Sequence, residues 1–267
     1  MISAERAIQR ARRDMRLTGA LNALTIIVIL AIPILRPLFS LPIDTIVGLT
    51  TVGAIWSILG IRSFKSSRLV AESPALIATG RYDVAEQNID GALRSFSIFR
   101  AVKLMSLHHL AALRHSQRRW REAAMLCREL LTQRIVTRQG LGRATQLILA
   151  DSLLEMNDLF GAGDCLRQLY QQRLSLSEAL SVLLVQLDYE SRLGSWASMM
   201  EGAPTKVSLA ELMPTPKSAR AQALLALAAR KGGRADWETW LRRRVELLID
   251  PQELTVRWPL LKELWLA

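Results

Sequence analysis

The three histidines of this chain, His108, His109 and His115, lie within a stretch of eight residues. A separation of seven places His108 and His115 on one face of a helix, and imidazole is the commonest side chain in protein metal sites. Two ligands from one helix do not complete such a site, so Asp151 or Glu155 on a following helix would have to supply the others. The alternative is that the histidines are polar residues lining a groove. We favour the groove, and therefore expect neither a metal nor a cofactor.

The sequence holds no other pattern that indicates catalytic chemistry. It lacks a phosphate-binding loop, a dinucleotide fingerprint, the motifs G-x-S-x-G and H-E-x-x-H, and any paired C-x-x-C. Cys127 and Cys165 each lie in an apolar helical run, as buried free thiols do. We therefore expect no catalytic residues, and we do not expect an enzyme.

Positive charge is concentrated near the N-terminus. The formal net charge is +11 over 267 residues. Residues 1–68 hold nine Lys/Arg and three Asp/Glu; the totals of 35 and 24 leave 26 and 21 for residues 69–267, so the two parts carry +6 and +5. An N-terminal excess of this kind indicates membrane orientation, and no nucleic-acid-binding motif accompanies it. The prediction is a lipid partner and no nucleic-acid partner.

The elements that would position the polar side chains repeat along the chain. Five times, a short polar turn is followed by an anchor residue, and these anchors are Ala85, Ala123, Ala162, Met199 and Trp237. Their separations are 38, 39, 37 and 38 residues, and a near-constant period in this range is typical of stacked repeats. Apolar residues recur at helical spacing on both sides of each turn. The sequence thus predicts an all-α domain of about five helix pairs.

This repeat resembles the tetratricopeptide repeat (TPR), which has a small or apolar pair in its first helix, a Gly-Asp-Tyr-like turn and then alanine. The closest match is GRYDVAEQNIDGAL, from Gly80 to Leu93. The residues that carry the resemblance are Gly80, Tyr82, Ala85, Trp120, Ala123, Ala162 and Trp196. The last two units depart from the pattern at Met199 and Trp237, and the period exceeds the family's by about four residues. The resemblance covers roughly residues 69–249 and implies a TPR-like α-solenoid.

In TPR-like proteins the first helix of each repeat lines a groove that binds peptides, and this implies a partner-binding site here. Placing the chain on the family's pattern puts the following residues on the inner face: His108, His115, Asp151, Glu155, Asp188, Arg192 and Arg230. The alternative is that each is a solvated surface group. Their mixed signs differ from the Lys/Asn-rich clamps of some family members. If His108 or His115 contacts a charged group, binding should change between about pH 5.5 and 7.5.

Two apolar segments precede the repeats. Residues 17–35 carry no charge, and at about 1.5 Å per residue they nearly span a hydrocarbon core of about 30 Å. Residues 45–61 are also uncharged and contain glycines, which are common in membrane helices. Pro37 and Pro42 in the connection are expected to break the helix. We predict a transmembrane hairpin over residues 17–61, rather than a cleaved signal peptide or a buried core hairpin.

Basic residues on the outer flanks of the hairpin predict its orientation. Arginines precede the first segment, Arg62, Lys65 and Arg68 follow the second, and the turn near Ser40 has few charges. Positive residues stay on the cytoplasmic side, so we expect both termini there. The excess of arginine over lysine suits a bacterium, and we expect its inner membrane.

The basic N-terminal segment, residues 1–16, has two interpretations. In one, it is a short helix whose apolar face lies on anionic headgroups, and this face comprises Ile2, Ala7, Ile8, Ala11 and Met15. In the other, it is a frayed tail that only sets the topology.

The expected plan is a cytoplasmic N-terminal segment (1–16), a transmembrane hairpin (17–61), a basic linker (62–68), TPR-like repeats (69–249) and a C-terminal capping helix (250–267). The function favoured by this plan is a membrane-anchored scaffold or adaptor that binds a protein partner through its repeats. The alternative is a structural subunit of a larger membrane complex whose hairpin makes the main assembly contact. Neither the partner's identity nor the oligomeric state follows from the sequence.

Overall fold

The computed structural model describes residues 2–39, 45–134, 136 and 140–265, without the side chains of residues 32–39 and 45–49. Within these ranges the chain is helical and contains no strand, as the sequence predicted. It divides into two compact units, Met1–Ile148 and Leu149–Ala267. The division falls inside the predicted repeat region, within helix α8 (Leu141–Glu155).

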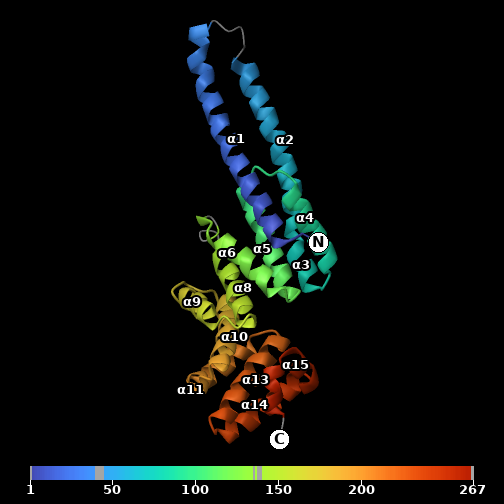
Figure 1. The fold of residues 1–267 in the computed structure, drawn as a ribbon, viewed down its shortest axis with the longest axis vertical. Coiled ribbons are helices and arrows are strands. Elements are labelled where there is room, and N and C mark those ends of the chain that lie inside the picture. Colours follow the sequence, from blue (N-terminus) through green and yellow to red (C-terminus); the bar gives the residue numbers. More distant parts are fainter. Residues whose placement is uncertain (1, 40–44, 135, 137–139, 266–267) are drawn as a thin grey trace. The chain divides into compact units, whose positions relative to one another are not determined.

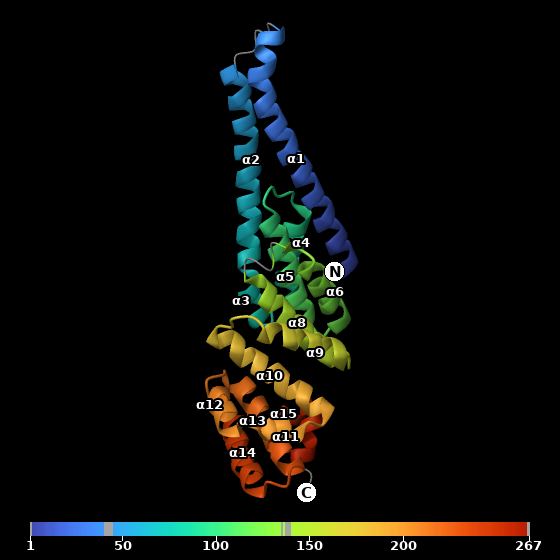
Figure 2. The same cartoon turned by 90° about the vertical axis from the view of Figure 1, so that its left-hand side faces the viewer.

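The N-terminal unit contains a pair of long helices and several shorter ones. Besides the start of α8, its helices are α1 (Ala4–Phe39), α2 (Thr45–Ala71), α3 (Ser73–Ala78), α4 (Tyr82–Arg94), α5 (Arg100–Ser116) and α6 (Trp120–Leu131). Within this unit, α1 and α2 lie side by side and extend well beyond the other helices (Figures 1 and 2). The turn predicted near Ser40 lies outside the described residues.

The first sixteen residues are neither a lipid-facing helix nor a frayed tail, and both expectations for them were wrong. They begin α1, which contacts α4, α5 and α6. The apolar face assigned to headgroups is buried, with Ala7 and Ala11 wholly inaccessible and Ile2, Ile8 and Met15 less than a tenth exposed. Packing against protein removes this face from water as a bilayer would, and two of the surrounding arginines, Arg10 and Arg12, pair with Asp90 and Glu129.

Helix α1 also continues past one of the two prolines that were expected to end it, while the other, Pro42, lies outside the described residues. The helix runs through Pro37 to Phe39, so the prediction of a break at Pro37 was wrong. A proline removes one backbone hydrogen bond and clashes with one carbonyl, which can kink a helix without ending it. The segment Ala4–Ala31 is, among the described residues, the one helix long and apolar enough to cross a membrane by its length and composition.

Residues 62–68, predicted to be a linker, are helical. Helix α2 continues without interruption from Thr45 to Ala71. Its last turns have a buried side formed by Ser63, Ser66 and Val70, although Arg62, Lys65 and Arg68 are exposed. A basic stretch with alternating buried residues is therefore a packed helical segment rather than a flexible connection.

All five predicted turns share one backbone geometry. Each contains a residue with positive φ, at Gly80, Arg118, Asn157, Gly194 and Gly233. The amide of the next residue donates to a carbonyl five positions earlier in every case, at 2.8–2.9 Å, as in Arg81 to Leu76 and Ser195 to Glu190. This is the 6→1 bond of a Schellman motif. The positive-φ residues are 38, 39, 37 and 39 apart.

The anchor residues follow these turns at the start of the second helix. Ala85, Ala123, Ala162 and Met199 are each wholly buried, five residues after the positive-φ position. In the fifth turn that position is Gly233, so the equivalent residue is Glu238 and the register that chose Trp237 was wrong by one. The amide of Glu238 donates to Arg234, as that of Ala85 does to Arg81.

The C-terminal unit is built around α13. Its helices are the end of α8, α9 (Leu159–Tyr170), α10 (Leu176–Leu193), α11 (Trp196–Met200), α12 (Ala203–Glu211), α13 (Thr215–Lys231), α14 (Ala235–Leu248), α15 (Pro251–Arg257) and the 3₁₀ helix η1 (Pro259–Leu264). Helix α13 is contacted by α10, α11, α12, α14 and η1, and nearly every side chain from Ala219 to Ala229 is buried. An alanine-rich helix lets its neighbours approach closely on all sides.

The single capping helix predicted over residues 250–267 was wrong, because two short elements occupy it. Helix α15 ends at Arg257, and η1 begins at Pro259. Pro259 follows Trp258, whose backbone leaves the helical region at ψ 85°, as expected for a residue before proline. Leu254, Leu261 and Leu264 are buried in the core that contains α13.

Candidate functional site

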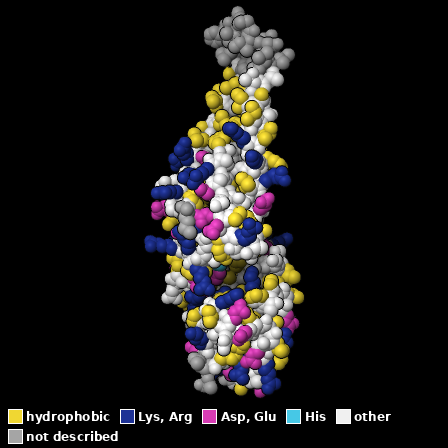
Figure 3. Space-filling view, turned by 90° about the vertical axis from the view of Figure 1, so that its right-hand side faces the viewer, with side chains coloured by type: hydrophobic (Ala, Val, Ile, Leu, Met, Phe, Trp, Pro, Cys, Tyr) yellow, Lys and Arg dark blue, Asp and Glu magenta, His cyan; other side chains and the backbone are white. Residues whose placement is uncertain are grey.

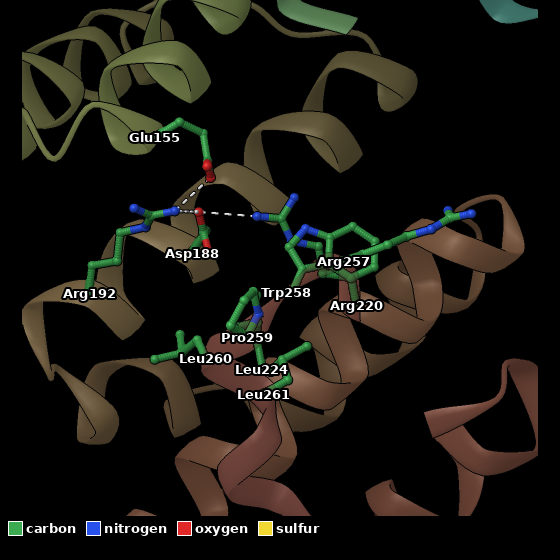
Figure 4. Close-up of a pocket in the computed structure, with 10 residues that line it drawn as sticks. All are labelled: Glu155, Asp188, Arg192, Arg220, Leu224, Arg257, Trp258, Pro259, Leu260 and Leu261. Carbon is green, nitrogen blue, oxygen red and sulfur yellow. Dashed lines mark hydrogen bonds and ion pairs between the residues drawn. The ribbon is translucent and has the colours of Figure 1, made fainter. Parts of the chain in front are cut away.

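The C-terminal unit has a pocket of about 240 Å³. Its polar lining comprises Glu155, Asp188, Arg192, Arg220 and Arg257, and its apolar lining comprises Leu224, Trp258, Pro259, Leu260 and Leu261 (Figure 4). These residues come from the end of α8, from α10 and α13, and from the α15–η1 junction. The kink before Pro259 turns the chain so that consecutive residues of the junction line the pocket.

Asp188 organises the charged side of the pocket. Its side chain is only 6% exposed, and Oδ2 lies 3.3 Å from Arg192 Nη2 and 3.1 Å from Arg220 Nη2. Arg192 also pairs with Glu155 at 2.6 Å and donates to the Leu154 carbonyl at 2.6 Å. Figure 4 shows Arg192, Asp188 and Arg220 in a row. A carboxylate shared by two guanidiniums fixes both of them, so their positions are set before any ligand arrives.

Trp258 connects the charged side to the apolar side. The guanidinium carbon of Arg220 lies 4.9 Å from the centre of the Trp258 ring, within the range of a cation–π contact. Leu224 and Leu261 are buried beneath the pocket, whereas Leu260 is 39% exposed. The pocket thus offers an apolar surface beside oriented N–H donors.

Guanidinium groups supply most of the charged side chains that line the pocket. Three guanidiniums face two carboxylates there, and the pairing of Arg257 with Glu253 at 2.7 Å brings the formal charges into balance. Guanidinium groups bind carboxylates through paired N–H donors. An acidic group beside an apolar side chain therefore complements this arrangement.

The structure brings together three of the residues predicted for the groove: Glu155, Asp188 and Arg192. Arg230 lies outside the pocket, where it donates to the Glu263 carbonyl and lies 3.9 Å from Glu238. Asp151 does not line the pocket. Sequence reasoning missed Arg220, Arg257 and Trp258, because the last two lie in the segment expected to be one plain capping helix.

The histidines belong to the N-terminal unit and are largely buried. His108 Nδ1 is 3.0 Å from Thr145 Oγ1, His109 Nδ1 is 3.0 Å from the Val70 carbonyl, and the His115 ring makes an edge contact with Trp120. Burial, with a smaller contribution from His109, lowers the pKa of His108 to about 4. His108 is therefore neutral between pH 5.5 and 7.5, so its own titration would not change partner binding in that window. The expectation that rests on His115 stays a prediction. Among the described side chains, no group of three or more His, Cys, Asp or Glu is arranged to hold a metal.

A second charged cluster holds the beginning of α1 in the N-terminal unit. Arg114 is wholly buried and donates to Glu86 Oε1 at 2.9 Å, to Glu86 Oε2 at 3.2 Å and to the Ile2 carbonyl at 2.7 Å. The Ile2 amide donates back to Glu86 Oε1 at 3.0 Å. Burial would raise the pKa of Glu86, but the bonds from Arg114 and Ile2 outweigh it and hold the pKa below its ordinary value.

Lys103 of α5 makes a similar connection to a later turn of α1. It is 1% exposed, pairs with Asp14 at 2.7 Å, and donates to the carbonyls of Ala92 and Leu93 at the end of α4. Burial lowers its pKa, and Asp14 partly opposes that shift. Nearer the surface, Arg12 holds both carboxylate oxygens of Glu129. Helix α1 is thus attached by specific charge pairs to α4, α5 and α6.

Comparison with known proteins identified no match: no protein-family model, no curated protein and no solved structure is similar to this chain.

Proposed function

We propose that this protein is a membrane-anchored helical scaffold that binds a protein partner. In this proposal α1 and α2 cross the membrane as a hairpin with both termini cytoplasmic, as they would lie in a bacterial inner membrane. The helix pairs form a TPR-like solenoid. The pocket lined by Asp188, Arg220 and Trp258 receives a partner segment that carries an acidic group next to an apolar side chain.

The observation that carries the anchoring proposal is the change of environment along α1. Its first turns are buried in protein, whereas residues from Leu17 onward are largely exposed, including Leu24, Ile26, Ile27 and Leu30 at 58–62%. Figure 3 shows hydrophobic side chains along one face of the projecting helix pair, with Lys and Arg gathered at its base. An exposed apolar surface of this extent needs a covering phase, and a bilayer supplies one.

The charge pairs at the start of α1 support a hairpin rather than a single crossing. Ile2 and Arg12 precede the apolar part of α1, while Glu86 and Glu129 follow α2. Because these residues are bonded to each other, a membrane crossed by the helix pair would have the segments before and after the pair on the same side. The basic flanks favour the cytoplasm for that side.

The five equivalent Schellman turns support a repeated helix pair as the building unit. Their spacing agrees with the TPR-like pattern of the sequence. A repeat architecture presents a surface rather than a catalytic cleft, and the preorganised Arg192–Asp188–Arg220 row is suited to recognition. Peptide segments with acidic and apolar residues meet both sides of the pocket.

The pocket is tested with the full-length chain purified from native membranes together with its partner. Arg257→Gln/Leu260→Ser changes two exposed pocket residues, and Val256→Ser changes a neighbour that is 76% exposed outside the pocket. We expect the partner to be lost with the double variant and retained with the control. Full retention by the double variant would exclude the pocket as the binding site.

The full chain is necessary because residues 2–18 are part of the packed N-terminal unit. Removing residues 1–68 would take away the parts of α1 and α2 that pack on α4 and α5, and it would leave Glu86 without Ile2. The competing function is a subunit assembled through the hairpin. It predicts that the partner crosslinks to α1 residues such as Ile27 and that the partner is retained by the double variant of the pocket. The same preparation therefore distinguishes the two.

A further inference from the structure

The loop between α4 and α5, residues 95–99, is joined to both long helices. Thr18 Oγ1 of α1 donates to the Ser97 carbonyl at 3.0 Å, and Ser63 Oγ of α2 accepts from the Ile98 amide at 3.1 Å. Ser66 Oγ and Ser95 Oγ are 2.7 Å apart. In both ribbon views the loop lies between the diverging ends of α1 and α2 (Figures 1 and 2).

The attachment is at the level where the apolar parts of both helices meet the rest of the unit. Thr18 follows Leu17, the first residue of the uncharged run in α1, and Ser63 lies two residues after Ile61, the last residue of the run in α2. The loop therefore marks one end of the apolar surface on both helices.

Two buried backbone groups of the loop are paired with side chains of the long helices. Loops at protein surfaces usually hydrate their backbone groups. Here the Ser97 carbonyl and the Ile98 amide are paired with hydroxyls of α1 and α2, and Ser63, Ser97 and Thr18 are at most 1% exposed. A loop at the boundary of a bilayer needs this kind of internal pairing, because the hydrocarbon region supplies no hydrogen bonds.

The exposed side chains at this level are aromatic and basic. Phe99 is 50% exposed and Phe64 is 66% exposed. Arg16, Arg62 and Arg100 are exposed beside them, and Arg100 also donates to the Met15 carbonyl at 3.3 Å. Large rings with guanidiniums on long stems suit a membrane interface, where the ring enters the acyl boundary and the cation meets phosphate.

We propose that the α4–α5 loop is a second membrane-contact element, which rests in the headgroup layer and sets how deeply the helix pair sits. In this arrangement Phe99 and Phe64 enter the acyl boundary, and Arg16, Arg62 and Arg100 bind the phosphates of anionic phospholipids. The proposal rests on the membrane anchoring proposed above, so its test must separate the two.

Nitroxide labels on the full-length chain in lipid nanodiscs provide that test. The label is placed at Phe99→Cys, at Ile27→Cys in the apolar part of α1, and at Arg81→Cys, an exposed residue at the opposite end of α4. The native Cys127 and Cys165 are buried. The ratio of accessibility to oxygen and to a water-soluble nickel complex reports depth. We expect the ratio at position 99 to lie several-fold above that at position 81 and below that at position 27.

Two different failures are distinguishable. If position 27 is as water-accessible as position 81, membrane anchoring itself is excluded. If position 27 is buried in lipid but position 99 matches position 81, anchoring stands and the loop proposal is overturned.

A second measurement tests the phosphate contacts. Spin-labelled phosphatidylglycerol should show a larger motionally restricted fraction than spin-labelled phosphatidylcholine. The variant Arg16→Gln/Arg62→Gln should remove that difference, and the charge-matched control Arg81→Gln/Arg128→Gln should preserve it. Equal fractions for the two lipids in the unaltered protein would reject anionic headgroups as the ligand of these arginines.

Discussion

Arg114 and Glu86 form a buried ion pair that also binds the backbone of Ile2. The guanidinium meets both carboxylate oxygens and the Ile2 carbonyl, and the Ile2 amide returns a bond to the carboxylate. Arg114 further donates to Gln117 at 2.7 Å, and its Nε lies 3.3 Å from Glu122. The pair therefore joins the start of the chain to α4, α5 and α6 through several contacts at once.

Arg114→Met should strongly destabilise the N-terminal unit. It leaves the Glu86 carboxylate buried without its counterion, and breaking a buried pair from one side costs about 3–5 kcal/mol. Unfolding of the full chain in detergent by urea measures the loss. Arg12→Met, which removes an exposed partner of Glu129, should have a smaller effect. The double variant Arg114→Met/Glu86→Leu should recover part of the loss, and no recovery would mean that the unpaired charge is not its cause.

Arg118→Gly should stabilise the protein. Arg118 is exposed and has φ 59°, in the region where glycine occupies three of the five equivalent turns. A side chain in this conformation costs roughly 1 kcal/mol or more relative to glycine. We expect a gain of about 1 kcal/mol, reduced by the greater freedom of glycine in the unfolded chain. Arg119→Gly, at a position with φ −90°, is the matched control and should destabilise instead.

Ala123→Trp and Ala162→Trp should both destabilise. Each alanine is wholly buried where the second helix begins, and overpacking such a contact costs about 1–3 kcal/mol. Ala197→Trp places the same ring on an exposed helical position and should be nearly neutral. Thermal unfolding of the full chain is the measurement. Unchanged melting temperatures in both core variants would contradict the buried position of these alanines.

Acidification should weaken the N-terminal unit in part through His108. Its native pKa is about 4, below the unfolded value of about 6.5. The unfolded state therefore binds more protons as the pH falls below about 6.5, and stability decreases by up to about 1.4 kcal/mol per pH unit until the native pKa is reached. The lowered pKa of His109 acts in the same direction. In His108→Gln the slope of unfolding free energy between pH 6.5 and 5 should be shallower, and an identical slope would contradict the prediction.

Cysteine labelling should place both ends of the chain on the cytoplasmic side. Single cysteines at Ser3 and Leu260, both exposed, should react with a membrane-impermeant maleimide only after the membrane is opened. Ser40→Cys, in the predicted turn, should react from the outside. Because Cys127 and Cys165 are buried, the background should be low. Labelling at Leu260 from the outside would contradict the hairpin.

The sequence was sufficient to predict that the chain is helical and to locate its five turns to within one residue, because both depend on local patterns. A left-handed residue, a Schellman bond and a compact anchor are all encoded within about ten residues of Gly80 or Gly194. The one-residue error at Trp237 arose because Gly232 and Gly233 are both suitable for that turn, and only the backbone distinguishes them. Here Gly233 has φ 68°.

The long-range contacts were not predictable in this way. The apolar face of residues 2–15 has the same pattern whether lipid or protein covers it. No sequence motif identifies Glu86 and Glu129 as the carboxylates that bind this segment. The pocket raised the same difficulty, since Arg220 lies on α13 while Arg257 and Trp258 lie at the α15–η1 junction. The residues Asp188 and Arg192 were predicted because the TPR-like pattern puts both of them on the inner face of one first helix.

The start of α1 is synthesised long before the residues that it binds. When Ile2 is added to the growing chain, its partner Glu86 is 84 residues from being made, and Glu129 is made 117 residues after its partner Arg12. Contacts of such sequence separation form late, because a long loop must close before they contribute. The apolar face of residues 2–15 therefore lacks its packing partners while α1 and α2 are synthesised. If the helix pair inserts into a membrane as the proposed hairpin, both of its flanks stay on one side of that membrane, and this would shorten the search that joins Arg12 to Glu129.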